Sequence, residues 1–88
     1  MDKNYYVYIL ATERNGTLYT GFTQNLAKRI WEHKNEAADG FTKKYNIKTL
    51  VYYETFNNYE AALGREKQLK KWRRLSKMNL IETMNPKW

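Results

Sequence analysis

The chain has 88 residues, which is enough for one domain and too few for two. It contains no cysteine, so disulfides, thiolate metal sites and thiol nucleophiles are excluded. Hydrophobic residues make up 42% of it, with only four glycines and one proline, which excludes a disordered chain. The apolar run at 5–11 is too short to span a membrane and resembles no signal peptide, so we expect a cytoplasmic protein.

The charge is strongly basic and unevenly spread. Sixteen Lys and Arg against nine Asp and Glu give a net charge of +7, and segment 64–77 holds seven basic residues and one acidic residue. A basic stripe on a small domain is typical of a protein that binds a polyanion. The alternatives are a solvated helix face and an anionic membrane surface, and the second lacks a broad apolar helix face to support it. Nucleic acid is therefore the expected partner.

The first half of the chain predicts a β-hairpin followed by a helix. Residues 4–12 are rich in aromatic and β-branched types and predict a strand. The Asn-Gly pair at 15–16 tolerates positive φ and predicts a hairpin turn into a second strand at 17–22. Apolar residues at helical spacing predict a helix over 25–38, with Asn25 as its N-cap.

The second half predicts a strand and two helices. A polar basic loop at 40–46 precedes a strand at 47–56. Asn57 or Asn58 caps the next helix, which extends to about residue 73; with Asn57, Glu60 completes a capping box.

Ser76 is the expected cap of a third helix, over 76–84, which the Asn-Pro pair at 85–86 ends. The resulting order is ββαβαα. It predicts an α/β chain of the α+β type, with a small three-stranded antiparallel sheet flanked by helices in one domain over residues 1–88.

Glu66 is the charged residue that fits its surroundings least well. At 100° per residue it falls in the middle of the apolar stripe of its helix, which consists of Tyr59, Ala62, Leu63 and Leu69. A buried carboxylate is costly unless it is paired or binds a metal. Two interpretations remain open: a functional carboxylate, or an ion pair with Lys70 one turn later.

Five residues nearer the N-terminus also stand out. Arg29 and His33 share one helix face at the edge of the sheet-packing surface, where an arginine fork suits phosphate; the alternative is an exposed arginine and a histidine at the rim. Tyr8 and Tyr19 lie in the first two strands, where tyrosine commonly serves packing alone. Gly21 is unusual in a strand, where glycine often marks a close approach by a ligand or another backbone.

In this order and spacing, these residues resemble the GIY-YIG endonuclease superfamily. The two halves of its name motif correspond to Tyr6-Val7-Tyr8 and Tyr19-Thr20-Gly21, with Tyr6 in place of glycine and Thr20 in place of isoleucine. The helix residues Arg29, His33 and Glu66 follow, so the motifs cover residues 4–73. Segments 41–42, 65–72 and 85–88 extend the similarity to the small stand-alone bacterial members, which are similar to the N-terminal nuclease domain of the excinuclease C subunit.

The resemblance implies a metal-dependent endonuclease that hydrolyses phosphodiester bonds, with DNA as the expected substrate. Glu66 would hold Mg²⁺ or Mn²⁺, and Arg29 would clamp the phosphate. Tyr8 or Tyr19 would accept a proton from the attacking water or orient it; we favour Tyr8 as the base, with His33 hydrogen-bonded to a tyrosine. The nucleic-acid backbone would be bound by Lys43, Lys44, Lys67, Lys70, Arg73 and Arg74.

Two other functions remain open. A non-catalytic nucleic-acid-binding module on the same fold would keep the basic helix and lack turnover. A protein-interaction domain would instead expose an aromatic patch of Tyr5, Tyr52, Tyr53 and Trp88. We expect a monomer or weak homodimer with no membrane partner.

Overall fold

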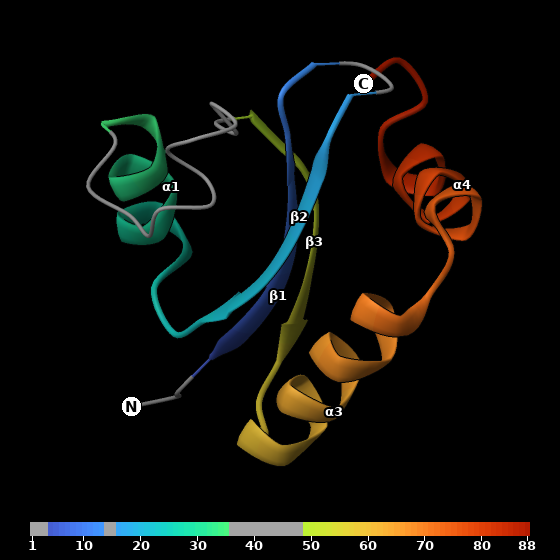
Figure 1. Cartoon of the computed structure of the whole chain (residues 1–88). Helices are drawn as coiled ribbons and strands as arrows, with labels where there is room; N and C mark the ends of the chain where they lie inside the picture. The colour runs from blue at the N-terminus through green and yellow to red at the C-terminus, as the bar shows by residue number, and fades with distance from the viewer. Residues whose placement is uncertain (1–3, 14–15, 36–48) are drawn as a thin grey trace.

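The computed structural model describes residues 4–13, 16–35 and 49–88. A three-stranded antiparallel sheet in the order β2-β1-β3 separates α1 on one face from α3 and α4 on the other (Figure 1). The elements are β1 (Tyr5–Ala11), β2 (Leu18–Thr23), α1 (Leu26–Lys34), β3 (Thr49–Phe56), α3 (Tyr59–Lys71) and α4 (Arg74–Met84). The predicted fold class and the order ββαβαα are confirmed. The predicted loop at 40–46, with Lys43 and Lys44, lies outside the described residues, as do positions 36–38 and 47–48.

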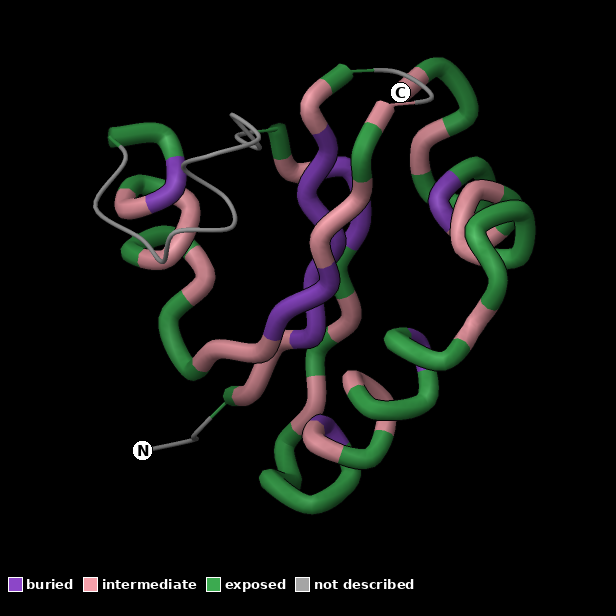
Figure 2. The backbone as a smooth tube through the Cα atoms, in the orientation of Figure 1, coloured by how far each residue is buried: buried purple, intermediate pink, exposed green. Residues whose placement is uncertain are grey.

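The central strand β1 supplies the core on both faces of the sheet. Because side chains alternate along a strand, Val7 and Ile9 face α3 and α4, whereas Tyr8 and Leu10 face α1. All four are at most 1% exposed. Figure 2 shows this buried centre, with the exposed residues mostly on the outer sides of the helices.

A β-bulge in β3 changes the simple alternation there. Ile9 pairs with Tyr52 and Leu10 with Leu50, so Val51 is an extra residue in β3. Val51 and Tyr52 are consequently both buried in the cluster that Ile81 of α4 covers. Tyr52 is only 6% exposed, so the predicted exposed patch of Tyr5, Tyr52, Tyr53 and Trp88 is wrong.

The helix caps follow the sequence in part. Asn25 Oδ1 accepts a hydrogen bond from the Lys28 amide, as predicted. Asn58, rather than Asn57, caps α3 by accepting from the Ala61 amide, so the capping box with Glu60 is wrong.

Ser76 does not cap the last helix. Trp72 and Arg73 are both extended, and α4 already begins at Arg74. Trp72 packs into the core cluster beneath α3, so the chain turns tightly there and the helix restarts two residues earlier than predicted. The Arg74 guanidinium also donates to the Gly16 carbonyl oxygen, which ties α4 to the β1–β2 connection.

A polar clamp joins β3 to α3. The Arg65 guanidinium binds the Glu54 carboxylate through Nε and Nη2, each 2.9 Å from an oxygen, and lies over the Trp72 ring. The Tyr52 hydroxyl donates to Glu54 Oε2 at 2.5 Å. Burial alone would raise the pKa of Glu54, but the bonds from Arg65 and Tyr52 outweigh burial and hold this pKa below its ordinary value. Burial and the adjacent carboxylate raise the pKa of Tyr52 to about 12, so its hydroxyl remains a donor.

Within the described ranges, every helix is too short or too polar to traverse a lipid bilayer.

We expect Arg65→Met to lower the free energy of unfolding at pH 7 by about 2 kcal/mol, because it leaves the Glu54 carboxylate half-buried without its cation. Glu54 has a lower pKa in the folded state than in the unfolded state. The contribution of the clamp is therefore complete above the unfolded value, about 4.3, and is lost as the pH falls through the folded value.

Urea unfolding of the wild type and of Arg65→Met at pH 7 and pH 3 measures the contribution of the clamp to the free energy of unfolding. The difference between them should narrow at pH 3, and Lys71→Met, an exposed change on the same helix, should change stability by less than about 0.5 kcal/mol. An Arg65→Met effect of equal size at both pH values would contradict the clamp.

Candidate active site

The ring of Tyr8 lies across the edge strand β2, over Gly21. These two residues are direct partners in the antiparallel register of β1 and β2. A Cβ built on Gly21 would lie 2.9 Å from Tyr8 Cε2 and closer still to Cζ and the hydroxyl oxygen. Only glycine leaves room for this ring. The glycine that stood out in the sequence therefore positions a tyrosine hydroxyl above the edge of the sheet.

Tyr8, Tyr19 and His33 form one cluster on the α1 face. Tyr8 Oη lies 3.3 Å from His33 Nε2, within hydrogen-bonding distance. The Tyr19 ring centroid lies 5.5 Å from that of His33 and 6.4 Å from that of Tyr8. Tyr8 and His33 are 1% and 3% exposed, whereas Tyr19 is half-buried. A proton can pass between the buried pair, and Tyr19 is the member of the cluster that solvent reaches more easily.

Arg29 lies beside this cluster rather than in it. It stands one helical turn before His33, and its Nη1 lies 3.8 Å from Glu32 Oε1. Such a long, partly exposed pair is weak, so the guanidinium is available to another anion. Arg29 lines a polar hollow of about 220 Å³, with Thr23, Gln24, Asn25, Lys28 and Glu32.

Glu66 satisfies both interpretations of its sequence pattern. It lies on the buried side of α3, between Ala62 and Leu69, which are both 0% exposed, and its side chain is 15% exposed. At the same time Lys70 Nζ lies 3.3 Å from Glu66 Oε2. Tyr59, expected in the same stripe, is 50% exposed, although its ring contacts those of Tyr5 and Phe22.

Glu66 and the tyrosine cluster lie on opposite sides of the sheet. Helix α3 covers the Val7 face, and the cluster belongs to the α1 face (Figure 1). Glu66 therefore does not face Tyr8 and Tyr19 directly. Helix α3 packs against β2 as well as β1, so the β2 edge is one route by which a single molecule could contact both groups.

The basic residues of the C-terminal half are used in different ways. Lys67 and Arg73 are exposed and available to a ligand, Lys70 pairs with Glu66, and Arg74 binds the Gly16 carbonyl. The sequence argument missed Lys77, which is half-buried; burial and the neighbouring Lys70 lower the pKa of Lys77. The sequence places Lys77 in the basic segment 64–77, but it does not show that the Lys77 side chain packs against the protein.

A metal bound at Glu66 would have a single carboxylate ligand. Across the part of the chain that the structure describes, no three His, Cys, Asp or Glu side chains gather into a metal site. Mg²⁺ commonly keeps several waters and binds one or two carboxylates together with substrate phosphates, so a lone glutamate fits this ion. Lys70 would have to release the carboxylate oxygen that it now holds.

Residues 4–79 match the family model described as the GIY-YIG catalytic domain. The chain belongs to the GIY-YIG family. The matched range contains both tyrosines, Gly21 and the helices that carry Arg29, His33 and Glu66, so the resemblance read from the sequence is confirmed.

The chain matches three similar proteins over most of its own length and of theirs. The UPF0213 protein of Clostridium perfringens is 42% identical over 93% of this chain and 87% of its own. The UPF0213 protein of Staphylococcus saprophyticus is 40% identical over 92% of this chain and 96% of its own. The solution NMR structure of the UPF0213 protein from Bacillus halodurans superposes with a TM-score of 0.57 at 31% identity, covering 91% of this chain and 84% of that one. These names state no reaction.

We expect Gly21→Ala to displace the Tyr8 ring and to lower the free energy of unfolding by about 1–3 kcal/mol, since the added Cβ overlaps a buried aromatic side chain. Gly64→Ala is the matched control: its Cβ would meet nothing within 4 Å, and in a helix interior the change should stabilise by about 0.5–1 kcal/mol. Thermal or urea unfolding measures both variants. Equal effects of the two substitutions would contradict the packing of Tyr8 over Gly21.

Proposed function

We propose that the protein is a metal-dependent endonuclease that hydrolyses phosphodiester bonds in nucleic acid, with DNA as the expected substrate. The observation that carries this proposal is the cluster of Tyr8, Tyr19 and His33, held above the edge of the sheet by Gly21. Membership of the GIY-YIG family and the net charge of +7 support it.

In this proposal the tyrosine cluster removes the proton from the attacking water. Tyr8 acts as the base, because its hydroxyl is within hydrogen-bonding distance of His33 Nε2, which can take up the proton in turn. Tyr19 is half-buried rather than enclosed, so it contacts and orients the water. Since Tyr8 is 1% exposed in the free protein, the substrate must open a path to its hydroxyl. Catalytic hydrogen bonds often form fully only in the complex.

The scissile phosphate would lie along the outer edge of β2. Arg29 reaches it from the α1 side, where its guanidinium suits two phosphate oxygens. Glu66 reaches it from the α3 side and would hold Mg²⁺ or Mn²⁺, which when bound stabilises the charge that develops on the phosphate and the leaving oxygen. Lys67 and Arg73, exposed at α3 and beyond its end, would bind the neighbouring backbone phosphates.

The alternative is a nucleic-acid-binding module without turnover. Two observations favour it: Tyr8 is almost fully buried, and Lys70 neutralises Glu66. Both proposals predict salt-dependent binding, so only cleavage separates them. We propose a cytoplasmic protein that is a monomer or a weak homodimer. One active site cuts one strand, so a dimer would be needed to cut both strands of a duplex at once.

Glu66→Ala should lower the cleavage rate about 100-fold or more and leave binding in EDTA within about threefold, because it removes the metal ligand and not the basic surface. Labelled single-stranded DNA, duplex DNA, branched DNA and RNA are incubated with Mg²⁺, Mn²⁺ or EDTA at low salt. Glu82→Ala, which removes an exposed carboxylate of α4, is the matched control and should cut normally. Binding without cutting by the wild type on every substrate would favour the binding module.

Substitutions of Tyr8 and Tyr19 should lower the cleavage rate to different extents in the same assay. Tyr8→Phe keeps the ring over Gly21 and removes only the hydroxyl, so we expect a rate loss of about 100-fold or more with a folded protein. Tyr19→Phe should cost about tenfold, since an oriented water can still react. Circular dichroism and single-turnover cleavage across pH 6–9 measure fold and rate. The reverse ranking would make Tyr19 the base, and two unaffected variants would remove the cluster from the mechanism.

A further inference from the structure

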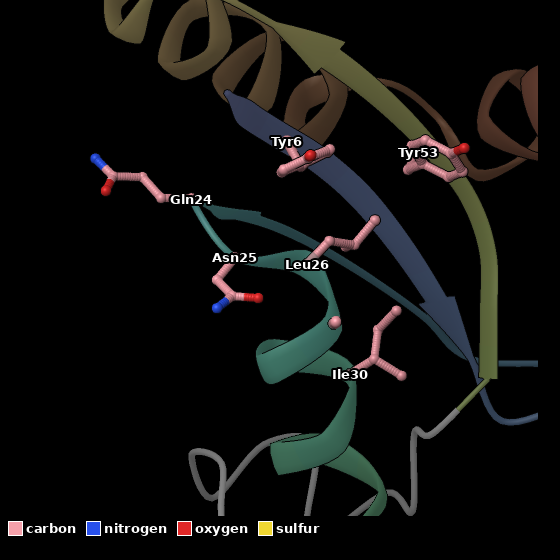
Figure 3. A pocket seen from close by; sticks show the side chains of 7 residues that line it. Tyr6, Gln24, Asn25, Leu26, Ile30 and Tyr53 are labelled. Carbon is pink, nitrogen blue, oxygen red and sulfur yellow. The ribbon is translucent and has the colours of Figure 1, made fainter. Parts of the chain in front are cut away.

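A second hollow on the α1 face takes no part in the proposed reaction. It has a volume of about 470 Å³, within the range of ligand pockets. Tyr6 of β1 and Tyr53 of β3 form its sheet side, and Leu26 and Ile30 point toward them from α1 (Figure 3). Ala27, Gln24 and Asn25 complete the lining. The hollow therefore has aromatic and aliphatic walls.

The two tyrosines offer ring surface rather than core packing. Tyr53 is 40% exposed and Tyr6 is half-buried, whereas Tyr8 on the same face is enclosed. Aromatic side chains at a partly open hollow are the platforms on which unpaired bases stack, whatever their sequence. The amides of the lining contribute little to base recognition: Asn25 Oδ1 already accepts from the Lys28 amide, and the Gln24 side chain extends away from the rings (Figure 3).

The pocket adjoins the tyrosine cluster. Tyr6 precedes Tyr8 by two residues on the same face of β1, a separation of about 7 Å along a strand. Tyr53 is the direct partner of Tyr8 in the register of β1 and β3. Because the Tyr8 ring leans the other way, over Gly21, the surface in front of Tyr53 is left open. One nucleotide of an extended strand spans about the distance between Tyr6 and Tyr8 along β1.

The pocket is also continuous with a site for phosphate. Gln24 and Asn25 line both this pocket and the polar hollow that contains Lys28 and Arg29. A nucleotide placed here would have its base against the tyrosines and its phosphate toward the two basic side chains. Glu32 is the acidic residue of that hollow, and Arg29 lies 3.8 Å from it.

We propose that the pocket between Tyr6, Tyr53 and α1 receives one unpaired nucleobase next to the cleaved bond, so that the substrate is single-stranded or locally unpaired nucleic acid. This inference rests on the proposed nuclease function. In a continuous duplex the bases are stacked and paired, and entry would require one of them to be flipped out. The apolar walls predict little preference among the bases.

The test measures binding separately from cutting. Fluorescence anisotropy in EDTA, with Glu66→Ala as the parent protein, gives the Kd for a thymidine oligomer, a uridine oligomer and a DNA duplex of the same length. The parent should bind at least one single strand more tightly than the duplex. Tyr53→Ala should raise the single-strand Kd by about 5- to 100-fold and change the duplex Kd by less than about twofold. Tyr53→Phe should restore single-strand binding, because it retains the ring.

Tyr59→Ala is the matched control, since Tyr59 is a comparably exposed tyrosine on α3, on the other side of the sheet. It should leave both Kd values unchanged. A 2-aminopurine in the oligomer should be quenched on binding by the parent and less by Tyr53→Ala. If Tyr53→Ala weakens binding of the single strand and the duplex equally, or weakens neither, the proposed base-binding pocket is wrong. If the wild type cuts and Tyr53→Ala has no effect on binding, the nuclease proposal holds and the base-binding pocket is wrong. If Tyr53→Ala weakens single-strand binding and the wild type does not cut, the base-binding pocket holds and the nuclease proposal is wrong.

Discussion

The contact between Tyr8 and Gly21 is the constraint on which the arrangement of the site depends. A tyrosine on a central strand would ordinarily point straight out of the sheet into the layer that covers it. Here the missing side chain on β2 lets the ring lie sideways, so that a hydroxyl rooted in the middle of the sheet reaches its border. Helix α1 must then sit at a height at which His33 meets that hydroxyl, and the capped start at Asn25 fixes where the helix begins.

The two faces of the sheet divide the chemistry between them. The α1 face carries the tyrosines, His33 and the hollow beside Arg29, and the α3 face carries Glu66 and the basic segment 64–77. An edge strand is normally a liability, because its unpaired backbone groups invite other chains. In the proposed function, the β2 edge is instead where the nucleic acid would contact both groups.

Local signals in the sequence predicted the local features well. The aromatic strands and Asn25 acted through neighbouring residues, and the strands β1 and β2 and the Asn25 cap are found as predicted. The Asn-Gly turn stays a prediction, because Asn15 lies outside the described residues. Apart from the capping box of Asn57 with Glu60, which is local, the wrong predictions depend on partners distant in the sequence. A helical wheel places Glu66 on the buried stripe but cannot tell which face of the sheet that stripe covers. The bulge at Val51, which buries Tyr52, depends on the register with β1, and the early start of α4 depends on how Trp72 packs. No pattern in the sequence links Glu54 to Arg65, eleven positions later.

The clamp on Arg65 has a consequence for its neighbour. Successive residues of a helix point about 100° apart, so a guanidinium held by Glu54 and stacked on Trp72 fixes the rotation of α3 about its own axis. The direction in which Glu66 points is thereby set by a residue that touches no substrate. If the proposed function is correct, a screen for lost activity would rank both positions together, because Glu66 would hold the metal and Arg65 would set the direction in which Glu66 points. Only a stability measurement would tell them apart.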